Sequence, residues 1–367
     1  MENNMICTFC NNQPNEGTLI EFDGRLMCEH CYHTQTTVCD CCGDRIWRDE
    51  AQGNSSTVLC NHCYEYNYSE CESCGCLIHN EYVLYDNDDY PYCEECFRRI
   101  NNSNIKPYSY KPDPIFYGSG DLYMGVEIEI DRGGYINNNA QKILDIANAS
   151  DEHIYCKHDG SIDDGFEIVS HPMTLNYHIN EMNWSEIFEK AVDMGYRSHQ
   201  TQTCGLHIHV NRSAFGDTYD KQEATIAKIV YFFESHWNEL VKFSRRTEAN
   251  LNHWASRYGI SDNAKETYKK AKDKHMGRYV AVNLTNYNTV EFRIFRGTLC
   301  YKTFIATLQL IDEICKLAYR FPDKFVEDLS WSDFVLCITK SKKPELIEYL
   351  KAKQLYVNEK IDESEDM

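Results

Sequence analysis

The stretch Gly125–Ile130 reads Gly-Val-Glu-Ile-Glu-Ile and decides the fold of the larger part of this 367-residue chain. Because successive side chains of a β-strand point to opposite faces, the stretch predicts a strand with Glu127 and Glu129 on one face. Val126 and the two isoleucines fall on the other face. The strand is therefore expected to border a core on one side and a polar space on the other.

Three further segments place ionisable groups in the same way. Gly205–Asn211 reads Gly-Leu-His-Ile-His-Val-Asn, which puts its polar residues on one face and its aliphatic residues on the other. Val290–Arg296 pairs an acidic with a basic residue, and residues 156–172 offer a turn followed by a short strand. The polar positions of these segments are Asp159, Glu167, His207, His209, Asn211, Glu291, Arg293 and Arg296.

Each of these patterns has an ordinary explanation when it is taken alone. A Glu-x-Glu pair is usually a solvated strand face, Glu291 and Arg293 form a simple salt bridge, and a single imidazole is commonly just hydrogen-bonded. Together, however, they describe a sheet that lines a polar cavity. Carboxylates with one imidazole suit magnesium or manganese, and arginines suit phosphate, so we expect a metal-complexed nucleotide there.

Longer segments between these strands repeat apolar residues at helical spacing. Residues 222–244 and 302–319 carry such stripes, which are typical of helices that face a core. Residues 139–149 and 176–195 indicate two further helices. Short strands that alternate with longer helices predict an α+β domain.

The first hundred residues differ sharply, because fourteen of the nineteen cysteines lie between Cys7 and Cys96. They form C-x-x-C pairs, and the pattern recurs every 32 residues, with one extra residue in the third unit. A unit of this size buries too little apolar surface to fold alone, which favours zinc held by four thiolates. Three zinc sites are predicted, on Cys7, Cys10, Cys28 and Cys31, on Cys39, Cys42, Cys60 and Cys63, and on Cys71, Cys74, Cys93 and Cys96.

Three alternatives stay open for the cysteines. Disulfides or an iron–sulfur site would use the same residues, and a cross-braced arrangement would pair them in another order. Cys41 and Cys76 are surplus to the three sites. The pattern resembles LIM-like and treble-clef zinc ribbons, which more often hold partners than catalyse reactions.

Charge and hydropathy exclude several classes of function. The formal charge is −20, and residues 1–100 carry 18 Asp+Glu against 5 Arg and no Lys. Such a surface does not suit nucleic acid, whereas a peptide or protein partner fits it. No apolar run is long enough to span a bilayer, and the start lacks a signal-peptide pattern, so we expect a soluble protein with no membrane partner.

Several blocks beyond residue 120 resemble the amidoligase family, a branch of the carboxylate–amine ligases with the glutamine synthetase fold. These blocks are G-V-E-I-E-I, H-D-G-S, F-E-I-V-S-H-P, C-G-L-H-I-H-V, R-Y-x-A-V-N-L and V-E-F-R-I-F-R-G-T-L, in family order between about residues 121 and 320. The resemblance implies an antiparallel sheet with helices outside it. Together with the cysteine repeat and the proline-containing segment that follows it, the resemblance divides the chain into a zinc-ribbon domain (1–100), a linker (101–120), a catalytic domain (121–330) and a helical extension with an acidic tail (331–367).

The resemblance also implies roles for single residues. It assigns magnesium or manganese to a set of carboxylates and one histidine, namely Glu127, Glu129, Glu167, His207 and Glu291. His209 would lie nearer the phosphates of ATP, and Arg293 and Arg296 would lie beside the transferred phosphoryl group. Asp159 is the candidate acceptor of the amine's proton.

The activity implied is ATP-dependent formation of an amide bond through an acyl phosphate. The substrates would be a carboxylate and an amine, with a peptide or protein acceptor held by the zinc ribbons, in the cytoplasm of a bacterium or a phage-infected cell. One alternative is a phosphotransferase on the same fold, and another is a zinc-ribbon adaptor with an inactive ligase-like domain. A zinc hydrolase is disfavoured because the chain has no H-E-x-x-H motif. The substrates and the oligomeric state are not specified by the sequence.

Overall fold

The computed structural model describes residues 6–13, 19–86, 89–101, 103–273 and 277–356. Contacts divide the chain into two compact units, each described here by itself. The cysteine-rich unit comprises residues 1–102 and 109–111, and the sheet unit comprises residues 103–108 and 112–367. None of the helices within the described residues has the length and apolar character that a bilayer span requires.

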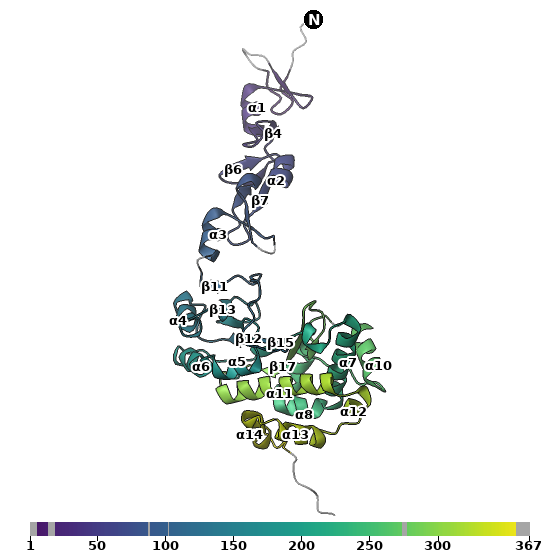
Figure 1. Cartoon of the computed structure of the whole chain (residues 1–367). Helices are drawn as coiled ribbons and strands as arrows, with labels where there is room; N and C mark the ends of the chain where they lie inside the picture. The colour runs from purple at the N-terminus through teal and green to yellow at the C-terminus, as the bar shows by residue number, and fades with distance from the viewer. Residues whose placement is uncertain (1–5, 14–18, 87–88, 102, 274–276, 357–367) are drawn as a thin grey trace, which may run out of the picture. The chain divides into compact units, whose positions relative to one another are not determined.

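The cysteine-rich unit consists of three successive modules of short antiparallel hairpins followed by a helix (Figure 1). Helix α1 is followed directly by the first strand of the next module, and so is helix α2. The elements are β1 (Ile20–Phe22), β2 (Arg25–Met27), α1 (Glu29–Gln35), β3 (Thr36–Val38), β4 (Arg45–Trp47), β5 (Gln52–Asn54), β6 (Thr57–Leu59), α2 (Asn61–Asn67), β7 (Tyr68–Glu70), β8 (Leu77–His79), η1 (Asn80–Tyr82), β9 (Leu84–Tyr85), β10 (Pro91–Tyr92) and α3 (Glu94–Asn101).

Side chains join each module to the next. Trp47 of the second module packs edge-on against Phe22 of the first and donates a hydrogen bond to Asp23. At the next junction the Asn80 amide donates to the Tyr66 carbonyl of α2, just as Arg48 Nε donates to the Thr34 carbonyl of α1. Because this hydrogen bond recurs 32 residues further along the chain, one contact of the junction repeats along with the cysteines.

The sheet unit is built on seven strands in the order β11-β13-β14-β12-β15-β17-β16. All neighbouring pairs are antiparallel except β11 with β13 at one edge, which is parallel. The strands are β11 (Ile105–Lys106), β12 (Met124–Ile130), β13 (Ile154–Lys157), β14 (Phe166–Ser170), β15 (Gly205–Asn211), β16 (Val282–Asn283) and β17 (Thr289–Arg296).

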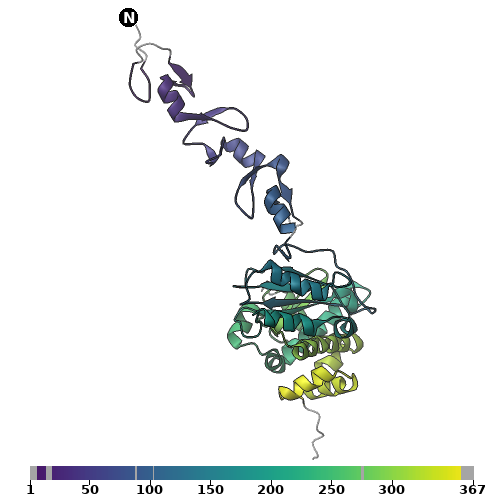
Figure 2. The same cartoon turned by 90° about the vertical axis from the view of Figure 1, so that its left-hand side faces the viewer.

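Helices cover the apolar face of this sheet, and Figures 1 and 2 show α11 between the sheet and the α13–α14 pair. Buried residues of α13 and α14, such as Phe334 and Leu350, belong to the same core as the sheet. The helices are α4 (Asn137–Ala147), α5 (Leu175–Asn180), α6 (Trp184–Asp193), η2 (Arg212–Phe215), α7 (Tyr219–Ser235), α8 (Trp237–Ser244), α9 (Glu248–Trp254), α10 (Ala264–Asp273), α11 (Tyr301–Arg320), α12 (Asp323–Glu327), α13 (Trp331–Lys340) and α14 (Pro344–Ala352).

The predicted fold class is confirmed: a mixed unit of helices and a mainly antiparallel sheet follows the cysteine-rich modules. Two helix predictions were too long. Residues 176–195 form α5 and α6, which a turn at residues 181–183 separates, and 222–244 break at His236, where the backbone leaves the helical region. Residues 101–120, predicted to be a linker, contain β11, an edge strand of the sheet. The acidic tail, predicted at 359–367, lies outside the described residues.

Candidate active site

Strand register brings the predicted site residues together on one face of the sheet. Glu129 lies opposite Glu167 of β14, and Glu127 lies opposite His207 of β15. On the other side of β15, His209 lies opposite Glu291 of β17. Residues 164 positions apart in the sequence, 127 and 291, thus become near neighbours.

The apolar residues between them explain why this face is fixed. Val126, Ile128, Leu206, Ile208 and Phe292 are all 0% exposed and point into the helical layer. A shift in register by one residue would exchange the two faces of a strand and bury its charges in the core. The hydrophobic pattern therefore holds the carboxylates and imidazoles on the opposite face.

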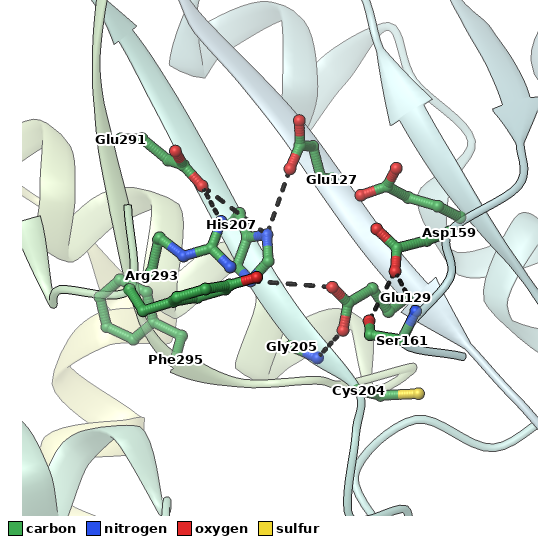
Figure 3. A network of polar contacts seen from close by, with 12 residues as sticks. Glu127, Glu129, Asp159, Ser161, Cys204, Gly205, His207, Glu291, Arg293 and Phe295 are labelled. Atoms are coloured by element: carbon green, nitrogen blue, oxygen red, sulfur yellow. Dashed lines mark hydrogen bonds and ion pairs between the residues drawn. The ribbon is translucent and has the colours of Figure 1, made fainter. Parts of the chain in front are cut away.

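His207 is the centre of the polar cluster (Figure 3). Its Nδ1 lies 3.1 Å from Glu127 Oε2 and 3.9 Å from Glu291 Oε1, and its Nε2 lies 3.8 Å from Glu129 Oε1. His209 Nε2 lies 3.2 Å from Glu127 Oε1. These separations place several potential ligand atoms around the two edges of one imidazole.

Two groups in this cluster have the composition and spacing of divalent-metal sites. Glu127, His207 and Glu291 form one, and Glu129, Glu167 and His207 form the other. Within each group the ligand atoms lie within 4.8 Å of one another. Carboxylate oxygens with one imidazole nitrogen suit magnesium or manganese, so the residues present fit the predicted cation.

The two groups differ in electrostatics. Burial raises the pKa of Glu167 well above its usual range, and Glu127 and Glu129 raise it further. Burial likewise raises the pKa of Glu129. For Glu127 the two histidines outweigh burial and hold its pKa well below normal. The pair Glu129 and Glu167 thus lacks enough positive charge from the protein alone, as expected for carboxylates that receive a cation.

Two residues beside this pair come from the 156–172 segment. Lys157 Nζ lies 3.7 Å from Glu167 Oε2, and both side chains are buried. Asp159 Oδ1 accepts hydrogen bonds from the backbone N–H and the hydroxyl of Ser161, at 2.7 Å and 2.5 Å. The Asp159 charge also raises the pKa of Glu129, which places it at the same end of the cluster.

Arg293 and Arg296 lie on β17, but their surroundings differ. Arg293 Nη1 is hydrogen-bonded to Glu291 Oε1. The register between β15 and β17 shifts between Leu206 and Ile208, so β17 carries a bulge close to Arg293. Such a bulge re-aims a side chain next to an active site. Arg296 lies opposite Gly205 at the strand end and is partly exposed.

Two side-chain amides donate hydrogen bonds to the Glu291 carboxylate. Asn283 of β16 is 1% exposed and donates to Glu291 Oε2 at 2.7 Å, and Asn286 donates to the same oxygen at 3.2 Å. Partners of this kind orient a metal-binding carboxylate and tune its affinity.

Aromatic and basic side chains connect the two edges of the sheet above the polar face. Tyr108, which follows edge strand β11, accepts a hydrogen bond from Arg278 Nη1 at 2.7 Å. Arg278 precedes β16 at the opposite edge and lies over the Tyr279 ring. Lys157 Nζ is 5.3 Å from the Tyr108 ring, and Arg293 Cζ is 5.8 Å from the Tyr279 ring. We call Tyr108, Arg278 and Tyr279 the strap.

The cysteines of the other unit form three groups, each within one module. Zn–S bonds of about 2.3 Å in a tetrahedron imply sulfur–sulfur separations of about 3.8 Å. The Sγ atoms of Cys10 and Cys28 are 3.8 Å apart, and the equivalent pairs Cys42/Cys60 and Cys74/Cys93 are 3.9 Å apart. The geometry fits zinc ribbons, and Cys41 and Cys76 are outside all three groups.

Sequence reasoning missed Lys157, Asn286 and Arg246. Arg246 follows α8 and is 8% exposed, with Nε donating to the Phe295 carbonyl of β17 at 3.2 Å. It falls just beyond the end of a helical stripe, where no periodicity marks it. The only signal is two adjacent arginines at the end of an amphipathic helix.

Comparison with known proteins gives a family match and a distant structural likeness. Residues 144–315 match the model of a family described as "Putative amidoligase enzyme". No curated protein sequence matches the chain. A solved structure, a bifunctional glutathione synthetase from Pasteurella multocida, is similar at 11% identity and a TM-score of 0.38, over 63% of this chain and 46% of that chain. The chain therefore spans less than half of that protein's length.

The match to the amidoligase family includes most of the polar cluster. Glu167, His207 and Glu291 lie within residues 144–315, and Glu127 and Glu129 precede them on the neighbouring strand. The family match supports an enzyme of the ligase type.

Proposed function

We propose, from the amidoligase match and the geometry of the polar cluster, that the sheet unit is an ATP-dependent ligase that joins a carboxylate to an amine. The observation that carries the proposal is the convergence of Glu127, Glu129, Glu167, His207 and Glu291 from four strands into two groups of ligand atoms. A structural salt-bridge network would not need so many buried carboxylates with so few cations.

In the first step an oxygen of the substrate carboxylate attacks the γ-phosphorus of ATP. The bond to the bridging oxygen breaks and ADP leaves with that electron pair, so an acyl phosphate forms. A divalent cation held by the two groups would neutralise charge on the phosphate oxygens. The chain's own contribution is to hold the carboxylates in place through Asn283 and the strand register, and to supply arginines at the phosphoryl group.

In the second step a neutral amine attacks the acyl carbon, and phosphate leaves. The amine loses a proton, and we assign its acceptance to Asp159. Both of its hydrogen bonds from Ser161 use Oδ1, so Oδ2 is the oxygen that takes the proton. The zinc-ribbon modules, with their strongly acidic composition, would hold a peptide or protein acceptor.

The test measures ADP release from ATP with magnesium or manganese and pooled carboxylates, with hydroxylamine as surrogate amine. A hydroxamate should form with the wild type and disappear with Glu129→Gln. Glu186→Gln, an exposed carboxylate in the first turn of α6, is the matched control and should retain full yield. Phosphorylated product without hydroxamate would instead identify a phosphotransferase, and no ADP at all would favour the adaptor interpretation.

A further inference from the structure

Arg246 is the one arginine of the described residues whose side chain is buried, and none of their carboxylates lies within ion-pair distance of it. Its only side-chain bond there runs from Nε to the Phe295 carbonyl, at 3.2 Å. Arg293, by contrast, is bonded to Glu291. Burial of an unpaired guanidinium costs several kcal/mol, so a fold retains one where an anion is received.

The backbone conformation before Arg246 directs its side chain toward β17. Arg245 ends α8 in the left-handed region, at φ 62°, which turns the chain so that the next side chain runs toward β17. The Arg246 N–H donates to Ser244 Oγ, and the Nε bond to Phe295 then fixes the plane of the guanidinium. Its two terminal nitrogens remain free to form a bidentate contact.

Gly205 lets this guanidinium and His207 lie close to its own backbone. A Cβ at Gly205 would overlap Arg246 Nη2 and lie 2.7 Å from His207 Nε2. The Gly205 N–H also donates to Glu129 Oε2. Arg246, His207 and Glu129 therefore converge on a residue without a side chain, at the end of the cluster where Glu129 and Glu167 lack positive charge.

Electrostatics agrees with an anion at this point. Burial lowers the pKa of Arg246 to about 10, so the group stays cationic at neutral pH. Glu129 opposes that shift, whereas Arg293 and Arg296 add to it, so three guanidinium groups lie near one another. A phosphoryl group in transfer spreads its charge over three oxygens, which suits the forked donors of a guanidinium.

We propose that the terminal nitrogens of Arg246 bind the phosphoryl group as it moves from ATP to the substrate carboxylate. This inference rests on the proposed ligase function and assigns to Arg246 the contact that the family resemblance implied for Arg293 and Arg296. Arg246 donates hydrogen bonds to the equatorial oxygens while the new P–O bond forms and the bond to ADP breaks. No proton changes place in this step.

The experiment compares two complexes of the full-length chain with magnesium, namely ADP and ADP with aluminium fluoride, which mimics the phosphoryl group in transfer. For Arg246→Met we expect the Kd of the aluminium fluoride complex to rise roughly 10- to 100-fold, the loss typical of hydrogen bonds to a charged group. The Kd of ADP alone should change less than about threefold. Arg246→Lys keeps the positive charge but loses the bidentate guanidinium. Its Kd for the aluminium fluoride complex should therefore lie between those of the wild type and Arg246→Met.

Matched controls separate this effect from unfolding. Arg320→Met removes an exposed arginine at the end of α11 and should leave both Kd values unchanged. Circular dichroism and thermal unfolding check each variant, and Arg246→Lys remains informative where Arg246→Met fails to fold.

The outcomes are distinguishable. Equal losses for ADP and for the aluminium fluoride complex, or no loss for either, would overturn the assignment of Arg246 while the ligase function stands. A wild-type chain that binds neither complex would remove the proposed function, and this inference with it.

Discussion

The two units of this chain assemble their candidate metal ligands in opposite ways. In the cysteine-rich unit each set of four ligands lies within 26 residues of sequence, such as 71–96. In the sheet unit the ligands span residues 127 to 291 and meet only because four strands pair. Local spacing therefore suffices to recognise the first kind of site, whereas the second depends on the whole fold.

The units also differ in what remains when the metal is removed. Each cysteine module has a core of three or four buried residues, two of which are cysteines. The sheet unit has a continuous core that includes fully buried aromatics such as Trp184, Phe292 and Phe304. Metal is thus expected to determine folding in one unit and chemistry in the other.

The largest effect should follow removal of a buried zinc ligand. Cys63→Ser deletes one of four thiolates in the second module, which has too little core to remain folded without metal. We expect zinc per chain to fall from three to two, and amide protection in residues 39–67 to disappear by hydrogen exchange. Cys41→Ser is the control, because Cys41 lies outside the zinc group and should leave three zinc ions bound. Equal losses in both variants would contradict the grouping.

Removal of a carboxylate from the sheet unit should abolish activity and leave the fold intact. Glu291→Gln removes a charge from one ligand group but keeps the shape that Asn283 holds, so the fold should survive. We expect metal-dependent ADP release to fall roughly 100-fold or more, as for other preorganised charges in active sites, with an unchanged unfolding temperature. Glu186→Gln again serves as the control. A large fall in the unfolding temperature would show that this cluster is structural.

The sequence predicted which side chains share the polar face of the sheet because their pattern has period two. Glu127, Glu129, His207 and His209 alternate with aliphatic residues, so the polar face followed from the strands themselves. Which strands are neighbours did not follow from alternation, since pairing depends on contacts distant in sequence. The resemblance to a family implied an antiparallel sheet but not the order of its strands.

Residues outside regular elements could not be predicted from periodicity. Arg246 depends on a left-handed turn at Arg245, and Tyr108 depends on an edge strand of two residues in a segment rich in proline. Helix boundaries also shifted where a capping residue or a turn ended the helix, as at His236. Such features arise from tertiary packing, which overrides local propensity.

Acid should destabilise the two units for different reasons, namely protonation of a buried histidine in the sheet unit and release of zinc from the cysteine-rich unit. His178 is fully buried in the sheet unit, where Nε2 lies 2.9 Å from the Met124 carbonyl and Trp184 donates to Nδ1. Burial lowers its pKa to about 4 from 6.5. The unfolded state therefore binds a proton first as pH falls, and the free energy of unfolding should drop by about 3 kcal/mol in total between pH 6.5 and 4.

The measurement follows urea unfolding of the sheet unit through hydrogen exchange of α5 and α6 at pH 7.5, 6.5 and 5.5. Zinc release from the cysteine-rich unit is followed separately with a chromogenic chelator. His178→Gln, which can still accept from Trp184 and donate to Met124, should reduce the dependence on pH by up to about 1.4 kcal/mol over the last of these steps. An identical pH dependence in wild type and variant would mean that His178 contributes nothing to acid sensitivity.

The smallest effect on activity is expected from the strap. It includes Tyr108, which lies outside the residues that match the family. Tyr108 lies outside residues 144–315, yet its hydroxyl accepts a hydrogen bond from Arg278 at the opposite edge of the sheet. Tyr108→Phe removes this bond and keeps the ring near Lys157. Since such a bond is worth about 0.5–1.5 kcal/mol, we expect a change of roughly two- to tenfold in KM for the acid or amine, with kcat nearly constant.

Tyr287→Phe provides the matched control, because Tyr287 is 92% exposed and lies between β16 and β17. A change in kcat without a change in KM would mean that the strap acts on the chemical step, by way of Tyr279 and Arg293. No change in either constant would make it a purely structural tie between the two edges. Either result would define what the edge strand β11 contributes to the sheet unit. This strand lies in residues 103–108, which directly follow the cysteine-rich residues in the sequence.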